Sequence, residues 1–273
     1  MQPGPRRAGP RRDLRHILHA AQGLTTDKPR RPGRLYAGTS GFAYPGWAPR
    51  FYPASLRGPQ LLPHYASRLP AVELNNTFYA RPTAQKVAGW VAATPPEFRF
   101  VVKAQRGASV RALYTDPFES IPWLTEPLPG FGERLGAVLF RIDTKAQRND
   151  ERLGGLLAAW PRTIPLVIEA QHPSWTADET FAAMRAAGAV LCTTDLDDEE
   201  QTPDIRRTGP FLYLRLRRTA YDEAALDAWA ARLVPFLDDG MDAYVLLRHD
   251  EDGTSAVQAE GFTARIDRIR ARG

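Results

Sequence analysis

The sequence of 273 residues has almost no cysteine and no long apolar run. Cys192 is the only cysteine, so the chain can form no internal disulfide, and we expect a reducing compartment, the cytoplasm. The apolar segment around it, AVLCTT, predicts a small core residue rather than a reactive thiol. No apolar stretch approaches the ~18 residues that a membrane-spanning helix requires, so we expect no membrane partner.

An excess of positive charge is absent from most of the chain. Residues 1–34 contain eight Arg and one Lys against Asp13 and Asp27, a net charge of +7. The remainder holds 27 basic and 29 acidic residues of the totals of 36 and 31. A basic tail binds polyanions without specificity, so nucleic acid is a candidate partner of this segment. Its Pro, Gly and Arg content predicts a disordered tail at 1–33 and a folded domain at 34–273.

Eight short apolar segments, which we interpret as strands, recur from Arg34 onward. They are RLYAGTS (34–40), AVELN (71–75), FRFVVK (98–103), LGAVLFRI (135–142), IPLVIEA (164–170), AVLCTTD (189–195), FLYLRLR (211–217) and AYVLLRH (243–249). Amphipathic or proline-rich segments separate them. This alternation is typical of a closed (β/α)8 barrel. A doubly wound open sheet is the alternative, but its glycine-rich loop opens directly on a helix, whereas GTSGFAYPG (38–46) leads into prolines and aromatics. We therefore predict the α/β class, a single-domain TIM-type barrel with a disordered N-terminal tail.

Polar residues end most of these predicted strands. Side chains on a strand alternate between its faces, so Glu73 and Asn75 share one face, and Val72 lies on the other. Active sites of (β/α)8 barrels are built where strands end. The polar residues at these positions are Glu73, Asn75, Lys103, Arg141, Asp143, Glu169, Gln171, His172, Asp195, Arg215, Arg217, Arg248, His249 and Asp250.

Glu73 and Glu169 are the most informative of these residues, because each follows an apolar run and projects inward, where an unpaired carboxylate is costly. Lys103, Arg141 and Arg215 are the expected partners. One interpretation is a structural ion-pair network. The other, which we favour, makes the glutamates general acid and base, with Lys103 and the arginines holding an anionic substrate.

A bound metal is a weaker hypothesis. Glu73, Glu169, Asp195, His172 and His249 offer oxygen and nitrogen ligands for a divalent ion. No tight ligand spacing occurs, and the neighbouring cations would repel a metal, so we predict no cofactor.

Aromatic residues cluster after the strand ends. Rings in such places stack on sugars or bases, or pack loops over the rim. We expect loop packing for Phe51 and Phe78. Tyr44, Trp47 and Tyr79 carry polar groups and are predicted to contact a ligand.

Several segments resemble the domain-of-unknown-function 72 family, also called YecE-like proteins. They are GTSGFAYPGWAPRFYP (38–53), LLPHYASRLPAVELNNTFYARP (61–82), PPEFRFVVKA (95–104), LGAVLF (135–140), VIEAQHPSW (167–175) and FLYLRLRR (211–218) with Tyr221 and LDAWA (226–230). The resemblance extends from about Leu35 to the C-terminus. It implies a (β/α)8 barrel with a polar pocket at the carboxyl ends of its strands, and no established activity.

The chain also departs from the family pattern. Glu73, Asn75, Lys103, Glu169, Asp195 and Arg215 stand where the resemblance places them, whereas Arg141, Gln171, Arg217 and Arg248 replace other residues. Three gained arginines imply either a more anionic substrate or a loss of catalysis.

The leading hypothesis is an enzyme acting on a small anionic substrate, such as a phosphorylated sugar or nucleotide. Glu73 and Glu169 would transfer protons, Lys103 and Arg215 would neutralise charge, and Asn75, Asp195 and Tyr79 would orient the ligand. Hydrolase, lyase and isomerase chemistry stay open. One alternative is a nucleic-acid-binding or processing protein that uses its tail and aromatic residues. The other is a non-catalytic barrel whose pocket has drifted.

Overall fold

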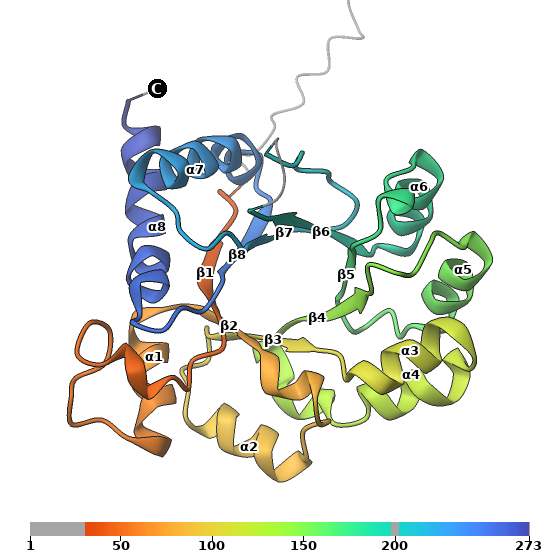
Figure 1. Cartoon of the computed structure of the whole chain (residues 1–273), viewed down its shortest axis with the longest axis horizontal. Coiled ribbons are helices and arrows are strands. Elements are labelled where there is room, and N and C mark those ends of the chain that lie inside the picture. The colour runs from red at the N-terminus through yellow and green to blue at the C-terminus, as the bar shows by residue number, and fades with distance from the viewer. Residues whose placement is uncertain (1–30, 198–201, 273) are drawn as a thin grey trace, which may run out of the picture. The chain divides into compact units, whose positions relative to one another are not determined.

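The computed structural model describes residues 31–197 and 202–272 and contains a closed barrel of eight parallel strands (Figure 1). Each strand pairs with the next along the chain, and β8 closes against β1. The strands are β1 (Leu35–Ser40), β2 (Ala71–Leu74), β3 (Arg99–Lys103), β4 (Leu135–Ile142), β5 (Leu166–Ala170), β6 (Val190–Asp195), β7 (Phe211–Leu216) and β8 (Asp242–Leu247). Seven of the predicted strand segments contain one of them, the eighth (243–249) overlaps β8, which begins one residue earlier, and the predicted barrel is confirmed.

Helices surround the barrel on its outside (Figure 1). The α-helices are α1 (Leu61–Arg68), α2 (Ala84–Ala92), α3 (Arg106–Tyr114), α4 (Pro117–Thr125), α5 (Asp150–Ala159), α6 (Asp178–Ala187), α7 (Glu223–Asp238) and α8 (Thr254–Arg270). Short 3-10 helices are η2 (Pro45–Trp47), η3 (Gly58–Gln60), η4 (Asn75–Phe78), η5 (Leu128–Arg134) and η6 (Pro173–Trp175). No helix in the described part of the chain is long and apolar enough to span a membrane. The predicted basic tail lies, up to residue 30, outside the described residues.

The strands are buried on both faces, which explains their nearly continuous apolar sequences. In β2, Val72 and Leu74 belong to the core between strands and helices, whereas Ala71 belongs to a second core inside the barrel. The alternation therefore turns Glu73 toward the barrel interior, as predicted. Below it, the interior is filled by apolar and aromatic side chains, including Tyr36 and Tyr244, whose rings stack with centroids 4.8 Å apart.

The pairing between β5 and β6 is shorter than the strands themselves. Only Val167 with Val190 and Ile168 with Leu191 are in register. Toward their carboxyl ends the two strands no longer pair with each other: Glu169 and Ala170 pair with β4 alone, and residues 192–195 pair with β7 alone. The barrel wall therefore opens between these two strands on the side where the polar residues gather.

Candidate active site at the barrel mouth

Arg215 lies at the centre of a buried ion cluster in the barrel mouth. Its Nε and Nη2 donate to Glu73 Oε2 and Oε1 at 3.0 and 2.7 Å, and its Nη1 donates to Glu169 Oε1 at 2.6 Å. All three side chains are at most 3% exposed. Paired geometry of this kind makes charge-assisted hydrogen bonds strong and fixes the planes of the groups.

Three hydroxyl groups also donate hydrogen bonds to the carboxylates. Tyr213 donates to Glu73 Oε2 at 2.8 Å, and Ser40 donates to Glu73 Oε1 at 3.2 Å. Thr194 donates to Glu169 Oε1 at 3.0 Å. The Oε2 atom of Glu169 accepts no hydrogen bond from the described residues, but Arg141 Nε lies 3.5 Å from it.

Both carboxyl groups are held in the ionised form. Burial alone would raise the pKa of Glu73, but the charges of Arg215 and Lys103 outweigh it and lower the pKa from 4.5 to about 2. Burial also opposes ionisation of Glu169, and the Arg215 charge again outweighs it, so the pKa of this carboxyl lies below its ordinary value. Neither group holds a proton near neutral pH.

Lys103 ends β3 beside this cluster and is 8% exposed. Its ammonium makes no ion pair with the described residues. Its nearest partners are Asn75 Oδ1 at 3.4 Å and the ring of Phe78, whose centroid is 4.5 Å away. Burial lowers the pKa of Lys103 to about 8, against the attraction of Glu73. Lys103 is therefore the group of the cluster that changes its charge near physiological pH.

Arg217 adds a further positive charge to the mouth. Its side chain is half-buried, and its Nη1 donates to Ser40 Oγ at 3.3 Å. No carboxylate of the described residues pairs with it. Burial, followed by the charge of Arg215, lowers the pKa of Arg217 below its ordinary value. This guanidinium thus lacks the counterion that its surroundings would favour.

Tyr44 and His249 form the rim beside Arg217. Their rings stack with centroids 4.8 Å apart and an interplanar angle of 5°. Burial raises the pKa of the Tyr44 hydroxyl, which donates to the carbonyl oxygen of Ser40. Burial and the charges of Arg217 and Arg248 lower the pKa of His249, so its imidazole is neutral at physiological pH.

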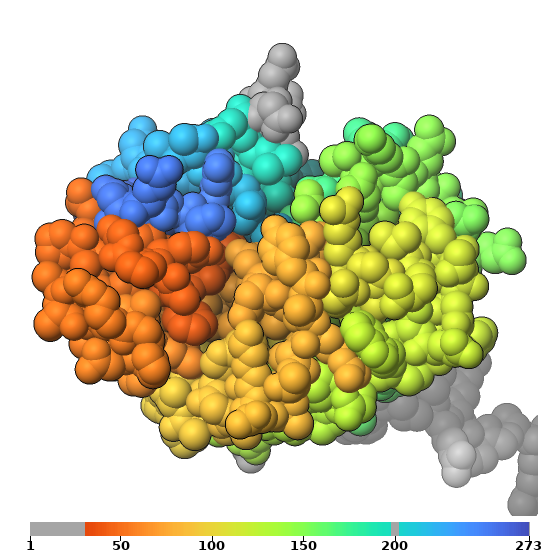
Figure 2. Space-filling model, turned by 60° about the horizontal axis from the view of Figure 1, so that its bottom comes forward, coloured from red at the N-terminus to blue at the C-terminus, as the bar shows by residue number. Residues whose placement is uncertain are grey.

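Figure 2 shows the segment around residue 50 in orange against the segment around residue 250 in blue. The ion pair of Arg50 with Asp252 joins these two segments.

Other predicted ligand contacts lie at the edge of the mouth. Arg141 donates through Nε and Nη2 to Gln171 Oε1 at 2.9 and 2.6 Å. His172 Nδ1 accepts from the backbone of Ser174 and caps η6. The Tyr79 and Arg248 side chains are exposed. The structure therefore brings Glu73, Asn75, Lys103, Glu169 and Arg215 together with Arg141 and Arg217, and places the remaining residues around them.

Asp195, predicted to orient a ligand, lies outside the ion cluster of the mouth. Asp195 is buried, but it follows Thr194 on β6 and faces the helices instead of the barrel interior. Its Oδ2 accepts from Tyr221 and Trp229, both at 2.9 Å, and its Oδ1 accepts from Arg218 at 2.9 Å. These bonds tie β6 to α7 and to the segment before it.

Trp47, predicted to contact a ligand, is packed inside the protein. Trp47 has no exposed surface, and its Nε1 donates to the carbonyl oxygen of Asp250 at 2.9 Å. Together with Phe51, also buried, it packs the loop after β1 against the end of β8. Phe51 therefore packs the loop, as predicted. Phe78 instead lies under the Lys103 ammonium.

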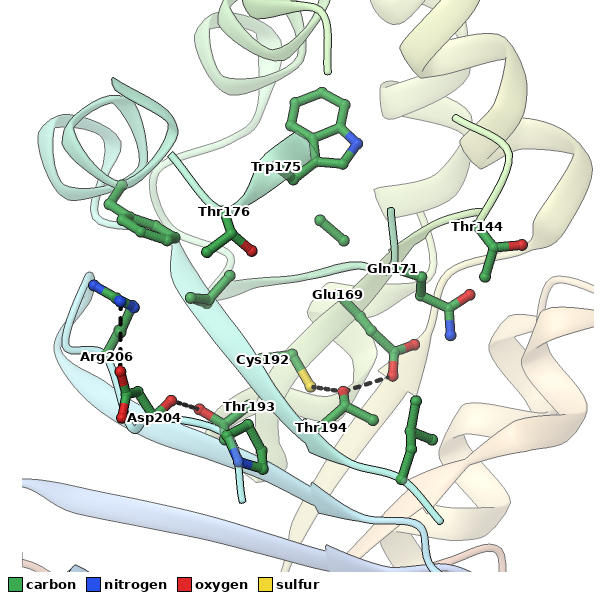
Figure 3. A pocket seen from close by; sticks show the side chains of 15 residues that line it. Thr144, Glu169, Gln171, Trp175, Thr176, Cys192, Thr193, Thr194, Asp204 and Arg206 are labelled. Carbon is green, nitrogen blue, oxygen red and sulfur yellow. Dashed lines mark hydrogen bonds and ion pairs between the residues drawn. The ribbon is translucent and has the colours of Figure 1, made fainter. Parts of the chain in front are cut away.

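A cavity of about 490 Å³ occupies the opening between β5 and β6 (Figure 3). Glu169, Cys192 and Thr194 lie together on one side of it, and Asp204 and Arg206 lie on the other. Burial raises the pKa of the Cys192 thiol well above its ordinary value, consistent with a core residue. Since Glu169 and Thr194 also belong to the ion cluster, the cavity adjoins the mouth and offers room for part of a small ligand.

Metal ligands are not grouped in this site. Within residues 31–197 and 202–272, no three His, Cys, Asp or Glu side chains are placed so as to hold a metal ion. The acidic candidates have other partners: Glu73 and Glu169 bind Arg215, and Asp195 binds Arg218.

Ser40, Tyr213 and Thr194 belong to the site but were not predicted. Each lies on the inward face of its strand, level with or next to a predicted residue. Ser40 pairs in register with Glu73, and Thr194 with Arg215. Tyr213 precedes Arg215 by two positions. Extending the alternation of faces to every strand would have identified all three.

A parallel eight-stranded barrel with charged side chains gathered at the carboxyl ends of its strands defines the (β/α)8 class of proteins. The sequence profile of the family described as "Protein of unknown function DUF72" matches residues 36–272, and the chain belongs to this family.

Three relatives illustrate the likeness. The UPF0759 protein YunF of Bacillus subtilis (strain 168) is 26% identical over 189 residues, which cover 63% of this chain and 65% of that protein. A DUF72 family protein of Thermotoga maritima MSB8 has a solved structure with 25% identity and a TM-score of 0.75, covering 86% of this chain and 99% of that one. Another, of Enterococcus faecalis V583, has 20% identity and a TM-score of 0.67 over 88% and 99% of the chains.

Proposed function

We propose that this protein is an enzyme that binds a small anionic substrate in the barrel mouth, with Lys103 as the group that exchanges a proton. The observation that carries the proposal is the excess of positive charge. Among the described residues, Lys103, Arg141, Arg215 and Arg217 surround two buried carboxylates, those of Glu73 and Glu169, and Arg141 also acts on the exposed carboxylate of Asp143. An anion is the ligand that would balance them, and arginines suit phosphate or carboxylate groups.

The geometry favours different roles for the glutamates from those expected from the sequence. General acid–base catalysis requires a pKa near the working pH. The low pKa of Glu73 and its bonds to Arg215 make it a poor acid and a weak base. In the proposed mechanism Glu73 and Glu169 instead hold Arg215 in place. Their negative charges also offset the positive charge of the mouth, which would otherwise destabilise the fold.

Arg217 and Arg141 are the proposed anion-binding groups. Arg217 donates a hydrogen bond to a hydroxyl and Arg141 to a neutral amide, so both can bind an incoming anion without giving up a strong short ion pair. Arg141 also attracts Glu169 at 3.5 Å, which fixes the direction of its guanidinium. Phosphorylated or carboxylated compounds small enough for the mouth and the adjoining cavity are the substrate class.

Thermal unfolding of the full-length protein across a panel of anions tests the proposal. Inorganic phosphate, sulfate, phosphosugars and nucleotides form the panel, with chloride at matched ionic strength as the reference. An anion at about 100 times its Kd stabilises by about 2.7 kcal/mol. For a chain of this size, that raises the midpoint by roughly 5–10 °C.

Two variants make the result specific for the mouth. Arg217→Gln removes a mouth guanidinium, and Arg185→Gln removes the same charge from the exposed surface of α6. The proposal predicts that Arg217→Gln weakens the shift and Arg185→Gln leaves it unchanged. Equal shifts in all three proteins would contradict it.

A further inference from the structure

Lysine is rare in this chain, which makes its presence in the mouth informative. The sequence has four lysines, at positions 28, 86, 103 and 145, and therefore 36 − 4 = 32 arginines. Lys86 and Lys145 are exposed, so Lys103 is the buried lysine of the described residues. An arginine would serve for charge alone, but only a lysine can lose its proton and present a nitrogen lone pair.

The surroundings of Lys103 suit an uncharged amine. Its ammonium lies on the ring of Phe78 and has one long hydrogen bond, to Asn75, so deprotonation breaks no ion pair with the described residues. The neighbouring charges of Arg215 and Arg141 add to burial in lowering its pKa to about 8. A lysine that is desolvated and placed next to cations is a recognised form of activated nucleophile.

The backbone holds this amine in place. The carbonyl oxygen of Lys103 accepts from Thr77 Oγ1 at 2.7 Å, and the following amide, of Ala104, donates to Leu139 at 2.9 Å. The side chain that carries Nζ thus extends from a strand end whose backbone is hydrogen-bonded on both sides, and such a fixed position is what a nucleophile requires.

We infer that Lys103 forms a Schiff base with the carbonyl group of an anionic aldehyde or ketone bound in the mouth. This rests on the proposed function and names its substrate class more narrowly. The neutral amine attacks the carbonyl carbon, a C–N bond forms and the C=O π bond breaks; the oxygen gains a proton and the nitrogen loses one, which gives a neutral carbinolamine. A further proton binds the hydroxyl, and the nitrogen lone pair then expels it as water, which breaks the C–O bond and leaves an iminium ion. One proton is consumed overall, and the positive iminium stays near Glu73 and Glu169.

Borohydride trapping on the full-length protein tests the inference. Hydride reduces an iminium to a stable secondary amine, so Lys103 gains the mass of the carbonyl compound less one oxygen atom. Pyruvate, glyoxylate and glyceraldehyde 3-phosphate are the probes, and acetaldehyde and acetone are neutral references. Cleavage after arginine releases residues 100–106, in which Lys103 is the sole lysine.

Lys86 and Lys145 are internal controls for random modification. At pH 7.5, an amine with a pKa of about 8 has a neutral fraction roughly 200 times that of an ordinary lysine. We expect labelling of Lys103 by an anionic carbonyl probe to exceed that of either control by at least about tenfold. Excess sulfate should suppress the labelling at Lys103 alone.

The outcomes separate this inference from the proposed function. If sulfate stabilises the protein but no anionic carbonyl probe labels Lys103 above Lys86 and Lys145, the Schiff base is refuted and anion binding stands. If neutral aldehydes label Lys103 as fast as anionic ones and sulfate has no effect, the amine is activated but the proposed anion recognition is wrong. Selective labelling that sulfate blocks supports both.

Discussion

Arg215 connects Glu73 to Glu169 across the barrel interior, with guanidinium nitrogens 2.7 and 2.6 Å from the two carboxylates. The three residues come from β7, β2 and β5, so a single arginine joins three strands that are not neighbours. Desolvation of such a cluster is offset only while all of its members are present. The cluster therefore fixes the shape of the mouth, and we propose that the cations around it bind the substrate.

Removing one member of this cluster should destabilise the fold. Glu73→Gln leaves Arg215 with one carboxylate, and we expect a loss of about 3–5 kcal/mol in the free energy of unfolding. Chemical denaturation followed by circular dichroism measures it. Glu260→Gln, which breaks a partly exposed pair with Arg68, is the control and should cost at most about 1 kcal/mol. Equal losses in the two variants would show that the buried cluster stabilises the fold no more than a partly exposed ion pair does.

Acid should weaken the protein through Glu73. Its pKa is lower in the folded protein, about 2, than the ordinary 4.5 of an unfolded chain. The resulting stabilisation, about 3 kcal/mol, is complete above pH 4.5 and is lost as the pH falls toward 2. Denaturation curves between pH 6 and 2 should show a smaller pH dependence in Glu73→Gln than in the wild type. Parallel curves would contradict the assigned pKa.

High pH should stabilise the protein through Lys103. Its folded pKa of about 8 lies below the ordinary 10.5, so the unfolded chain binds more protons between these values. Stability from this group therefore rises as the pH increases from about 8 to 10.5. We expect Lys103→Met to be more stable than the wild type at pH 7, with the difference shrinking toward pH 10. If Lys103→Met were less stable than the wild type at pH 7, the charged form of Lys103 would not destabilise the folded protein, and the lowered pKa would be contradicted.

Anion affinity should fall as Lys103 loses its proton. Sulfate is the suitable probe, because it stays a dianion throughout this range. Its Kd should increase several-fold as the pH rises through about 8 in the wild type, and this step should be absent in Lys103→Met. Titration calorimetry in buffers of matched ionic strength separates the effect from salt screening. A step that persists in Lys103→Met would assign the titration to another group.

Asp195 should affect stability and not binding. Asp195→Asn replaces a charged acceptor for Arg218, Tyr221 and Trp229, and we expect a loss of about 1–3 kcal/mol in the free energy of unfolding. Sulfate affinity should equal that of the wild type at a temperature where both are folded. Weaker sulfate binding by the folded variant would instead support the ligand-orienting role predicted from the sequence.

Alternation along the strands explains how much of this site could be predicted. It correctly turned Glu73 and Glu169 inward, and the same rule would have turned Asp195 outward, because Thr194 faces the interior beside Arg215. Asp195 has the polar character of a site residue, but its place in the alternation puts it on the other face. The face that a side chain occupies is therefore predictable from alternation along its strand, whatever its chemistry.

Contacts between distant segments could not be predicted in this way. That Arg215 binds both glutamates, rather than Lys103 or Arg141 binding one each, depends on the stagger of the closed barrel. The burial of Trp47 depends on the carbonyl of Asp250, which is 203 positions away. From the sequence alone its indole N–H predicts a contact with a ligand, because nothing in the neighbouring sequence shows that a backbone oxygen accepts from it.

Calorimetric titration of sulfate into the wild type, Arg217→Gln and Arg185→Gln at pH 7 tests most directly whether the unbalanced cations of the mouth bind a small anion. Removing a charge-assisted hydrogen bond costs about 1.5–3 kcal/mol, so we predict sulfate binding that weakens roughly 10- to 100-fold in Arg217→Gln. Arg185→Gln should match the wild type. No saturable binding in the wild type, or the same Kd in all three proteins, would contradict it.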